Sequence, residues 1–274
     1  MLTVVSKDGT HIAFEKTGKG PPLVLLPAGG GNDHTRWELA GVREAFARQF
    51  TTYAVDTRGL GQSGDSDEYS LEREFEDVAA VVDSIDEPVN LLGHSSGALL
   101  ALNAALLTDN LRTLILYEPP IMVGEHELYS KEVLAELKRL LGMGEREQFL
   151  ITFLQDVGGA STAETDMLRK APNWQNRVDA AHVILRGLQE VGHYRFDAAR
   201  FAEMTIPTLL LTGSESSPPF RDATNLVHEA LPNSRIVIFE GHGHVATLTA
   251  TDRFIDEVIS FINNNEDREY KGGH

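Results

Sequence analysis

Short runs of consecutive apolar residues, each followed by turn-forming residues, recur along most of the chain. Runs of this kind suit strands that are buried on both faces, as in a parallel sheet, and they lie at 23–26, 51–55, 89–92, 113–117, 208–211 and 235–239. Segments with helical periodicity, such as 71–85 and 97–107, lie between most of these runs. The alternation predicts an α/β fold with a doubly wound, mostly parallel sheet.

Two further patterns complete the predicted architecture. At the N-terminus, "LTVVS" and "HIAFEKTG" flank Asp8-Gly9, which predicts a β-hairpin and brings the expected sheet to about eight strands. From about residue 122 to 200 the pattern is helical only, and strand signals return at Ile206. We therefore expect a core made of residues 1–121 and 201–274, with an all-helical cap at 122–200 inserted after the sixth strand.

Charge and composition narrow the classes of function. The 274-residue chain has 24 Lys and Arg against 41 Asp and Glu, and its formal net charge of −17 argues against nucleic acid and anionic membranes as partners. The absence of cysteine excludes disulfides, a thiolate nucleophile and cysteine zinc ligands. No signal peptide and no bilayer-length apolar stretch is recognisable, so we expect a soluble, cytoplasmic protein.

The clearest chemical signal is "GHSSG", residues 93–97, between an apolar run and a helical one. In a strand–turn–helix context, Gly-x-Ser-x-Gly places a serine nucleophile, here Ser95, on a tight turn that small glycines permit. The helix that follows favours negative charge near its start, and the backbone N–H of Ser96 is positioned to bind an oxyanion. A phosphate-binding loop is the alternative, but the lysine of a P-loop is absent.

Three more stretches resemble the α/β-hydrolase fold family. "VDTRGLGQSG" (55–64) resembles the family's Asp-x-Arg-Gly-x-Gly-x-Ser loop, and "LLPAGGG" (25–31) resembles its oxyanion loop. "EGHGH" (240–244) resembles the loop that carries the catalytic histidine, and the family's order of serine, acid and histidine is kept. The resemblance spans nearly the whole chain apart from the helical insertion.

This resemblance implies roles for single residues. Ser95 would be the nucleophile, His244 the base, and the backbone N–H groups of Gly29 and Ser96 the oxyanion hole. The oxyanion loop here begins Pro27-Ala28 where the family usually has His-Gly, so the donor from this loop stays open. A serine nucleophile also argues against dehalogenases and epoxide hydrolases, which in this fold use an aspartate.

The catalytic acid is missing from its usual place. In "TGSESSPPF" (212–220) the usual position falls near Ser216, which cannot carry a charge. Glu118, in "LILYEPP", ends the strand after the elbow helix, and neighbouring strands of such a sheet end at the same edge. We predict that Glu118 is the acid, with Glu215 as the alternative; a surface or capping carboxylate is the non-catalytic interpretation of Glu118.

A serine–glutamate–histidine layout of this kind resembles that of the fungal zearalenone lactonases, which have a Gly-x-Ser-Ser-Gly elbow and Glu-x-Pro at this strand end. The cap shows no comparable match. Substrate contacts are predicted for Gly30, Pro119 and Trp174, although core packing is an equal alternative for Trp174. His242 has no partner ligands in the sequence, and neither a metal nor a cofactor is expected.

These residues predict a serine hydrolase that cleaves an ester or lactone of a small, neutral, fairly apolar molecule through an acyl-enzyme. C–C hydrolysis, acyl transfer and perhydrolysis by the same triad stay open. A small-molecule receptor with vestigial hydrolase activity is the alternative from another class. The sequence does not determine the acyl and alcohol groups of the substrate. It also leaves the oligomeric state open, with a homodimer as one option.

Overall fold

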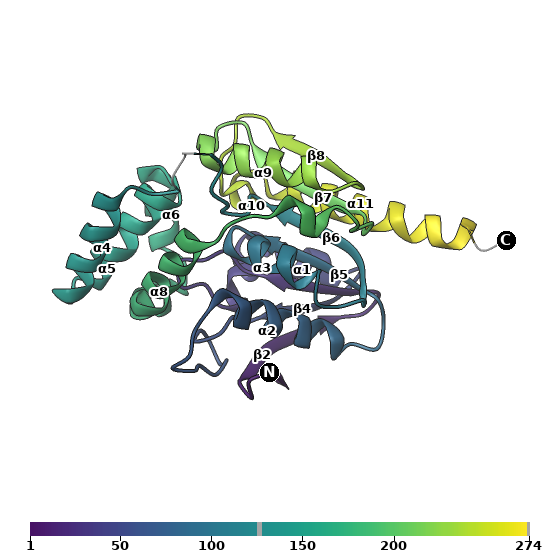
Figure 1. Cartoon of the computed structure of the whole chain (residues 1–274), viewed down its shortest axis with the longest axis horizontal. Coiled ribbons are helices and arrows are strands. Elements are labelled where there is room, and N and C mark those ends of the chain that lie inside the picture. The colour runs from purple at the N-terminus through teal and green to yellow at the C-terminus, as the bar shows by residue number, and fades with distance from the viewer. Residues whose placement is uncertain (125–127, 273–274) are drawn as a thin grey trace.

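The computed structural model describes residues 1–124 and 128–272, and it confirms the predicted α/β fold (Figure 1). One eight-stranded sheet has the order β1-β2-β4-β3-β5-β6-β7-β8. Only β2 runs against its neighbours, β1 and β4; the remaining pairs are parallel. The strands are β1 Leu2–Val5, β2 His11–Gly18, β3 Pro22–Leu26, β4 Thr51–Val55, β5 Val89–His94, β6 Leu111–Tyr117, β7 Thr208–Gly213 and β8 Ser234–Phe239.

Helices cover both faces of this sheet, which is why its central strands are apolar on both sides. On one face lie α2 (Leu71–Asp83), α3 (Ser96–Ala104) and α9 (Pro218–Ala230), whose apolar side chains form one core cluster with the sheet. On the other face lie the 3-10 helix η1 (His34–Gly41), α1 (Val42–Ala47) and α11 (Thr251–Gly272). The short α10 (Ala246–Thr249) leads into α11.

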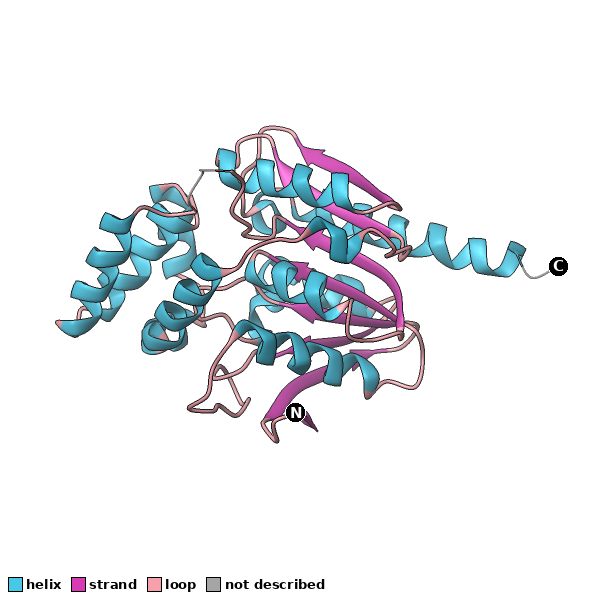
Figure 2. Ribbon diagram, viewed as in Figure 1, coloured by secondary structure: helices cyan, strands magenta, loops and turns pink. Residues whose placement is uncertain are grey.

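Between β6 and β7 the described residues form five α-helices and a short π-helix, within the range expected for the cap. They are α4 (Lys131–Gly142), α5 (Arg146–Thr152), η2 (Phe153–Val157), α6 (Thr162–Arg169), α7 (Trp174–Asp179) and α8 (Ala181–His193), and a 3-10 turn η3 (Ala198–Phe201) follows. Figure 1 shows them gathered on one side of the sheet, and Figure 2 shows that the group contains no strand among its described residues. Their apolar side chains form a third core cluster of their own.

One difference from the sequence pattern lies in the last cap segment. The helical pattern of 175–191 is interrupted, because α7 ends at Asp179 and α8 begins at Ala181. Both helices contribute residues to the pocket described below. None of the described helices has the length and apolar character that crossing a membrane requires.

Candidate active site

Ser95 occupies a strained turn between β5 and α3. Its φ and ψ of 56° and −122° are unusual for a residue with a side chain, as expected for a nucleophile held on a sharp elbow. The two flanking glycines are required by space. A Cβ at Gly93 would lie 2.2 Å from the carbonyl oxygen of Gly97, and a Cβ at Gly97 would lie 2.5 Å from that of Pro27. The Gly-x-Ser-x-Gly spacing therefore follows from backbone packing.

Glu118 directly follows β6 and also has a positive φ, of 49°. Ser95 N–H donates to the Tyr117 carbonyl at 2.8 Å, so the elbow and the residue before Glu118 are joined across neighbouring strands. The fully buried carboxylate of Glu118 accepts hydrogen bonds at Oε1 from Thr212 Oγ1 at 2.7 Å and from Gly213 N–H at 2.8 Å. Its Oε2 lies 2.5 Å from His244 Nδ1. The structure thus brings Glu118 and His244 together.

The environment of Glu118 favours the charged carboxylate. Burial raises the pKa of this group, but the hydrogen bond from His244, the nearby imidazole and the Gly213 N–H outweigh that effect, and the net pKa lies below its usual value. The carboxylate is therefore ionised at neutral pH. An ionised carboxylate at this position favours the tautomer of His244 that carries its proton on Nδ1, and this tautomer leaves Nε2 free to accept a proton.

The stretch 212–220 holds no competing acid at His244. Glu215 is exposed, and its Oε1 lies 3.5 Å from the hydroxyl of Ser214. Ser216, near the position where the family usually has its acid, is buried beside the Glu118 carboxylate, but its hydroxyl makes no well-formed hydrogen bond among the described residues. Thr212 and Gly213, which sequence reasoning missed, support Glu118 from the end of β7; their only signal was that they end a neighbouring parallel strand.

Contacts from β6 and α9 hold the loop that carries His244. Tyr117 Oη donates to the Gly243 carbonyl at 2.5 Å and accepts from Ala246 N–H at 3.1 Å. The ring of Phe220 stacks on the His244 imidazole, with 4.1 Å between ring centroids. Ser95 and His244 line the same pocket. The structure records no hydrogen bond between these two described residues, which is common where no substrate is bound.

His94 has a supporting position beneath this loop. Its Nε2–H donates to the His244 carbonyl at 2.8 Å, and its ring stacks on Tyr117 with a centroid distance of 4.7 Å. Burial lowers the pKa of His94 well below its usual value, and the nearby His244 and Arg36 act in the same direction. His94 is therefore neutral, and it donates its single N–H proton to the loop rather than to a substrate.

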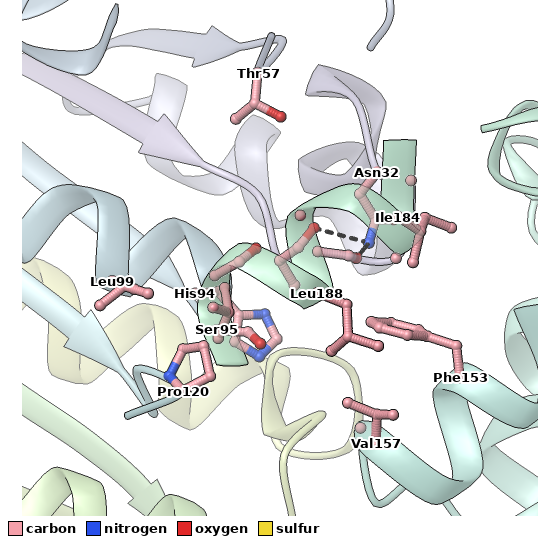
Figure 3. Close-up of a pocket in the computed structure, with 18 of the residues that line it drawn as sticks. Asn32, Thr57, His94, Ser95, Leu99, Pro120, Phe153, Val157, Ile184 and Leu188 are labelled. Atoms are coloured by element: carbon pink, nitrogen blue, oxygen red, sulfur yellow. Dashed lines mark hydrogen bonds between the residues drawn. The ribbon is translucent and has the colours of Figure 1, made fainter. Parts of the chain in front are cut away.

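The predicted oxyanion donors lie next to the elbow. Ser96 is the first residue of α3, so its N–H has no acceptor within the helix. Gly29 lies against it, since a Cβ at Gly29 would be 2.9 Å from Ser96 Oγ. Asn32 Nδ2 donates to the carbonyls of Ala28 and Gly29 at 3.1 Å and 2.6 Å and so fixes the loop (Figure 3).

A single pocket between core and cap contains Ser95, Ser96, His244, Gly29 and Gly30. Apolar side chains from the elbow helix and the cap form most of its wall, and Figure 3 shows Leu99, Phe153, Val157, Ile184 and Leu188 around Ser95. Of the three predicted substrate contacts, Gly30 lines this pocket.

The other two predicted contacts lie elsewhere. Pro120, not Pro119, is the proline in the pocket lining. Trp174 is not among the described lining residues, because its ring packs in the cap's own core and its Nε1–H donates to Glu147 at 3.1 Å. The sequence pattern could not separate these possibilities, since the direction of a side chain depends on how the cap helices pack.

Asp33, His34 and Asp56 are the described residues whose grouping is compatible with a metal ion. Their acceptor atoms are already used, because Asp56 Oδ1 accepts from His34 N–H and lies 2.8 Å from His34 Nδ1, while Asp33 caps η1 through Thr35 N–H. His242 lies outside this group, with its Nδ1 2.9 Å from Thr249 Oγ1. These contacts indicate that Asp33, His34 and Asp56 support the loops beside the oxyanion loop.

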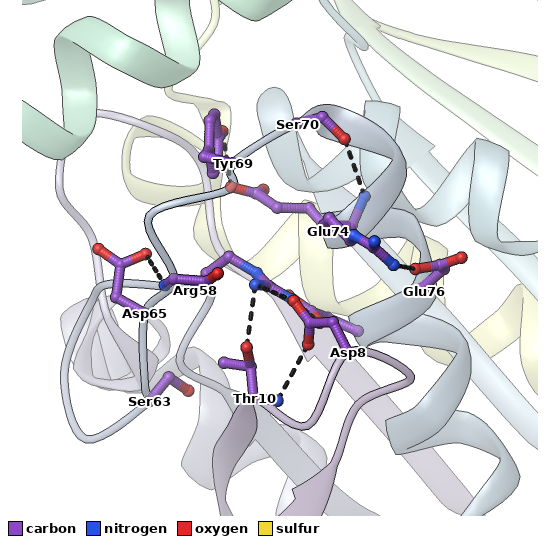
Figure 4. Close-up of polar contacts among 12 residues, drawn as sticks. Asp8, Thr10, Arg58, Ser63, Asp65, Tyr69, Ser70, Glu74 and Glu76 are labelled. Carbon is purple, nitrogen blue, oxygen red and sulfur yellow. Dashed lines mark hydrogen bonds and ion pairs between the residues drawn. The ribbon is translucent and has the colours of Figure 1, made fainter.

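A polar network holds the loop of residues 55–64 beside the pocket (Figure 4). Arg58 is buried and binds Asp8 at 2.6 Å and Asp77 at 2.7 Å, as expected for a residue that fixes this loop. Next to it, Tyr69 Oη donates to Glu74 Oε1 at 2.8 Å, and both residues line the pocket.

The environment of Glu74 predicts a contribution to stability that depends on pH. Burial raises its pKa to about 7, and the hydrogen bond from Tyr69 opposes this only in part. A raised folded-state pKa gives stability that is complete below the unfolded value, 4.5, and is lost as the pH rises through about 7. We expect the free energy of unfolding of Glu74→Gln, relative to that of the wild type, to be about 2 kcal/mol higher at about pH 8 than at about pH 5. Urea unfolding at the two pH values measures this difference.

Glu76→Gln is the matched control on the same helix. Its pKa is lowered by the hydrogen bond from Lys7, so its effect on stability should be the same at both pH values. An equal effect of Glu74→Gln at the two pH values would show that Glu74 ionises normally.

A serine on a strand–helix elbow, in a pocket at the end of a mostly parallel sheet under a helical cap, defines an α/β-hydrolase. The chain belongs to the alpha/beta hydrolase family, whose model matches residues 23–257, and it is accordingly an enzyme of the hydrolase class. It is 28% identical, over 92% of this chain and 99% of the relative, to the pimeloyl-[acyl-carrier protein] methyl ester esterase of Aeromonas hydrophila.

Solved structures agree with this assignment. An alpha/beta hydrolase from Sphaerobacter thermophilus is 32% identical with a TM-score of 0.76, covering 92% of this chain and 99% of its own. The esterase RhEst1 from Rhodococcus is 26% identical, also with a TM-score of 0.76, over 96% of this chain and 98% of its own. Esterases are therefore among its relatives in both sequence and structure.

Proposed function

We propose that this protein hydrolyses carboxylic esters or lactones through an acyl-enzyme formed on Ser95, with His244 as base and Glu118 as the orienting acid. The observation that carries the proposal is the 2.5 Å contact of Glu118 Oε2 with His244 Nδ1, in a loop whose imidazole lines the same pocket as the elbow serine. The esterase relatives support ester hydrolysis over the other reactions of such a triad.

The chemistry follows from the geometry of the three groups. Ser95 Oγ attacks the carbonyl carbon while His244 Nε2 takes its proton, and the imidazolium that forms is stabilised by the ionised Glu118. The N–H groups of Ser96 and Gly29 bind the oxyanion. His244 then protonates the leaving alcohol, and a water activated by the same imidazole hydrolyses the acyl-enzyme.

The wall of the pocket supports a fairly apolar substrate. Side chains of α3, η2 and α8 face the serine, so most of the surface that a substrate meets is hydrocarbon (Figure 3). Because η2 and α8 belong to the cap, substrate choice should depend on the cap more than on the triad.

Labelling with a fluorophosphonate tests the proposal directly. We expect one covalent adduct per chain, located on Ser95 by peptide mass spectrometry, together with loss of activity toward a panel of short esters and lactones. Ser95→Ala should abolish both. A folded protein that is labelled on another residue, or on none, would contradict a serine mechanism at this site.

A further inference from the structure

Two buried arginines are among the residues that line the pocket. Arg36 belongs to η1 and Arg177 to α7, and their exposed fractions are 3% and 2%. Within the described ranges, no carboxylate oxygen lies within 4.0 Å of either guanidinium. The pocket wall thus contains two cations without an ion-pair partner.

Their hydrogen bonds leave donors free. Arg177 Nε donates to the Gly30 carbonyl at 2.7 Å, and Arg36 Nη2 donates to Thr247 Oγ1 at 2.7 Å. Arg36 Nη1 is buried without a hydrogen-bond partner in the described structure. A Cβ at Gly30 would lie 2.9 Å from Arg177 Nη2, so this guanidinium lies directly against the oxyanion loop.

Another arginine of the same pocket shows the contrast. Arg58 also lines it, but its guanidinium binds the carboxylates of Asp8 and Asp77. Acidic residues are plentiful, with 41 Asp and Glu against 24 Lys and Arg, so a shortage of carboxylates does not explain the unpaired pair. An unpaired buried charge is costly, and such groups in pockets are often satisfied by a ligand.

The two guanidinium groups also repel each other. Burial lowers the pKa of Arg36 to about 10 and that of Arg177 to about 9, and the charge of Arg36 contributes to the second shift. The negative charge of Asp33, which lies beyond ion-pair distance, raises the pKa of Arg177 and offsets the lowering only in part. Both arginines remain charged at neutral pH, and an anion placed beside them would remove the repulsion and accept from the free donors.

We infer that Arg36 and Arg177 form a binding site for a carboxylate, and that the preferred substrates are esters bearing one negative charge in addition to the ester group. The inference rests on the proposed function and narrows its substrate class. It replaces the neutral molecule predicted from the sequence, because two arginines without an ion-pair partner line the pocket. The rest of the wall still requires a mostly apolar substrate.

Matched pairs of esters test the inference on the wild-type protein. Monomethyl glutarate against methyl pentanoate places the carboxylate on the acyl side, and butanoyloxyacetate against ethyl butanoate places it on the alcohol side. We expect kcat/KM to be at least about 10-fold higher for the charged member of one pair, the scale of one hydrogen bond to a charged group. The pair that shows the preference identifies the side that faces the arginines.

Substitution of Arg177 connects that preference to the site. Arg177→Met removes the charge at similar length, and we expect it to lower kcat/KM for the charged ester about 10- to 100-fold more than for its neutral partner. Arg177→Lys should retain part of the preference. Arg139→Met, at an exposed cap arginine paired with Glu136, should leave the preference unchanged.

The outcomes separate this inference from the proposed function. Phosphonate labelling of Ser95 and hydrolysis of neutral esters without preference for either charged ester would overturn the carboxylate site and leave the hydrolase intact. Equal losses on charged and neutral esters in Arg177→Met would assign that arginine to support of the oxyanion loop. Absence of both labelling and hydrolysis would overturn both proposals.

Discussion

Replacing Glu118 by Gln lowers turnover by about 10⁴ in the mechanism proposed here, the scale of removing the orienting acid of such a triad. The amide oxygen can still accept from Thr212 and Gly213, so the supporting hydrogen bonds at Oε1 have a replacement. The amide NH₂ then faces His244 Nδ1 and favours the tautomer with its proton on Nε2. That tautomer cannot accept the proton of Ser95. Steady-state kinetics and the rate of phosphonate labelling should fall together.

Glu215→Gln is the control for this experiment, since Glu215 is exposed and lies in the loop where the family usually has the acid. We expect little change in turnover, with both variants showing the wild-type circular dichroism spectrum. If Glu215→Gln proves the more damaging of the two, the assignment of Glu118 is wrong and the acid lies in the loop after β7.

Ser96→Pro tests the oxyanion hole by removing one backbone donor. Turnover should fall by roughly 10²–10³, the usual effect of losing one such donor. Proline is tolerated at the first position of a helix, which Ser96 occupies, so the substitution is better suited to this site than to the helix interior. Single-turnover measurements of acylation should show the loss directly.

Ser96→Ala separates the backbone donor from the hydroxyl. Alanine keeps the N–H, so most activity should remain. A loss in Ser96→Ala as large as in Ser96→Pro would place the hydroxyl, not the N–H, at the substrate. Because proline also restricts Ser95, thermal unfolding of both variants must accompany the kinetics.

The elements of the fold were predictable because the runs of buried strand residues leave few alternatives. The six apolar runs all became strands of the sheet, and the Asp8-Gly9 turn joined two more. The position of Glu118 was also accessible, since a charged residue directly after a buried strand of a parallel sheet must lie at the edge where other strands end. The groups that hydrogen-bond to Glu118 were not predictable, because the Thr212 hydroxyl and the Gly213 N–H meet its carboxylate only after β6 and β7 pair.

The cap was less predictable for a physical reason. Helical periodicity shows that a segment is a helix. The core of the cap and the wall of the pocket both require apolar helix faces, so the pattern does not determine which apolar residues pack in the core and which line the pocket. Trp174 was therefore predicted to contact substrate, with core packing as an equal alternative, and it packs inside the cap. Three positions away in the chain, Arg177 lines the pocket, and a single arginine in a helical segment carries no signal that distinguishes it from a solvated one.

In the proposed triad the serine and the acid are held together more rigidly than either is held to the histidine. One reason is the hydrogen bond between Ser95 N–H and the Tyr117 carbonyl, which joins the ends of their two strands. Nucleophile and acid follow adjacent strands in fixed register, so warming or motion of the cap changes their spacing little. The imidazole reaches them on a separate loop, anchored to Tyr117 and to His94. The alignment of the three groups therefore depends mainly on the position of the histidine loop. Heat or denaturing solvent should displace the histidine before the spacing of the serine and the acid changes.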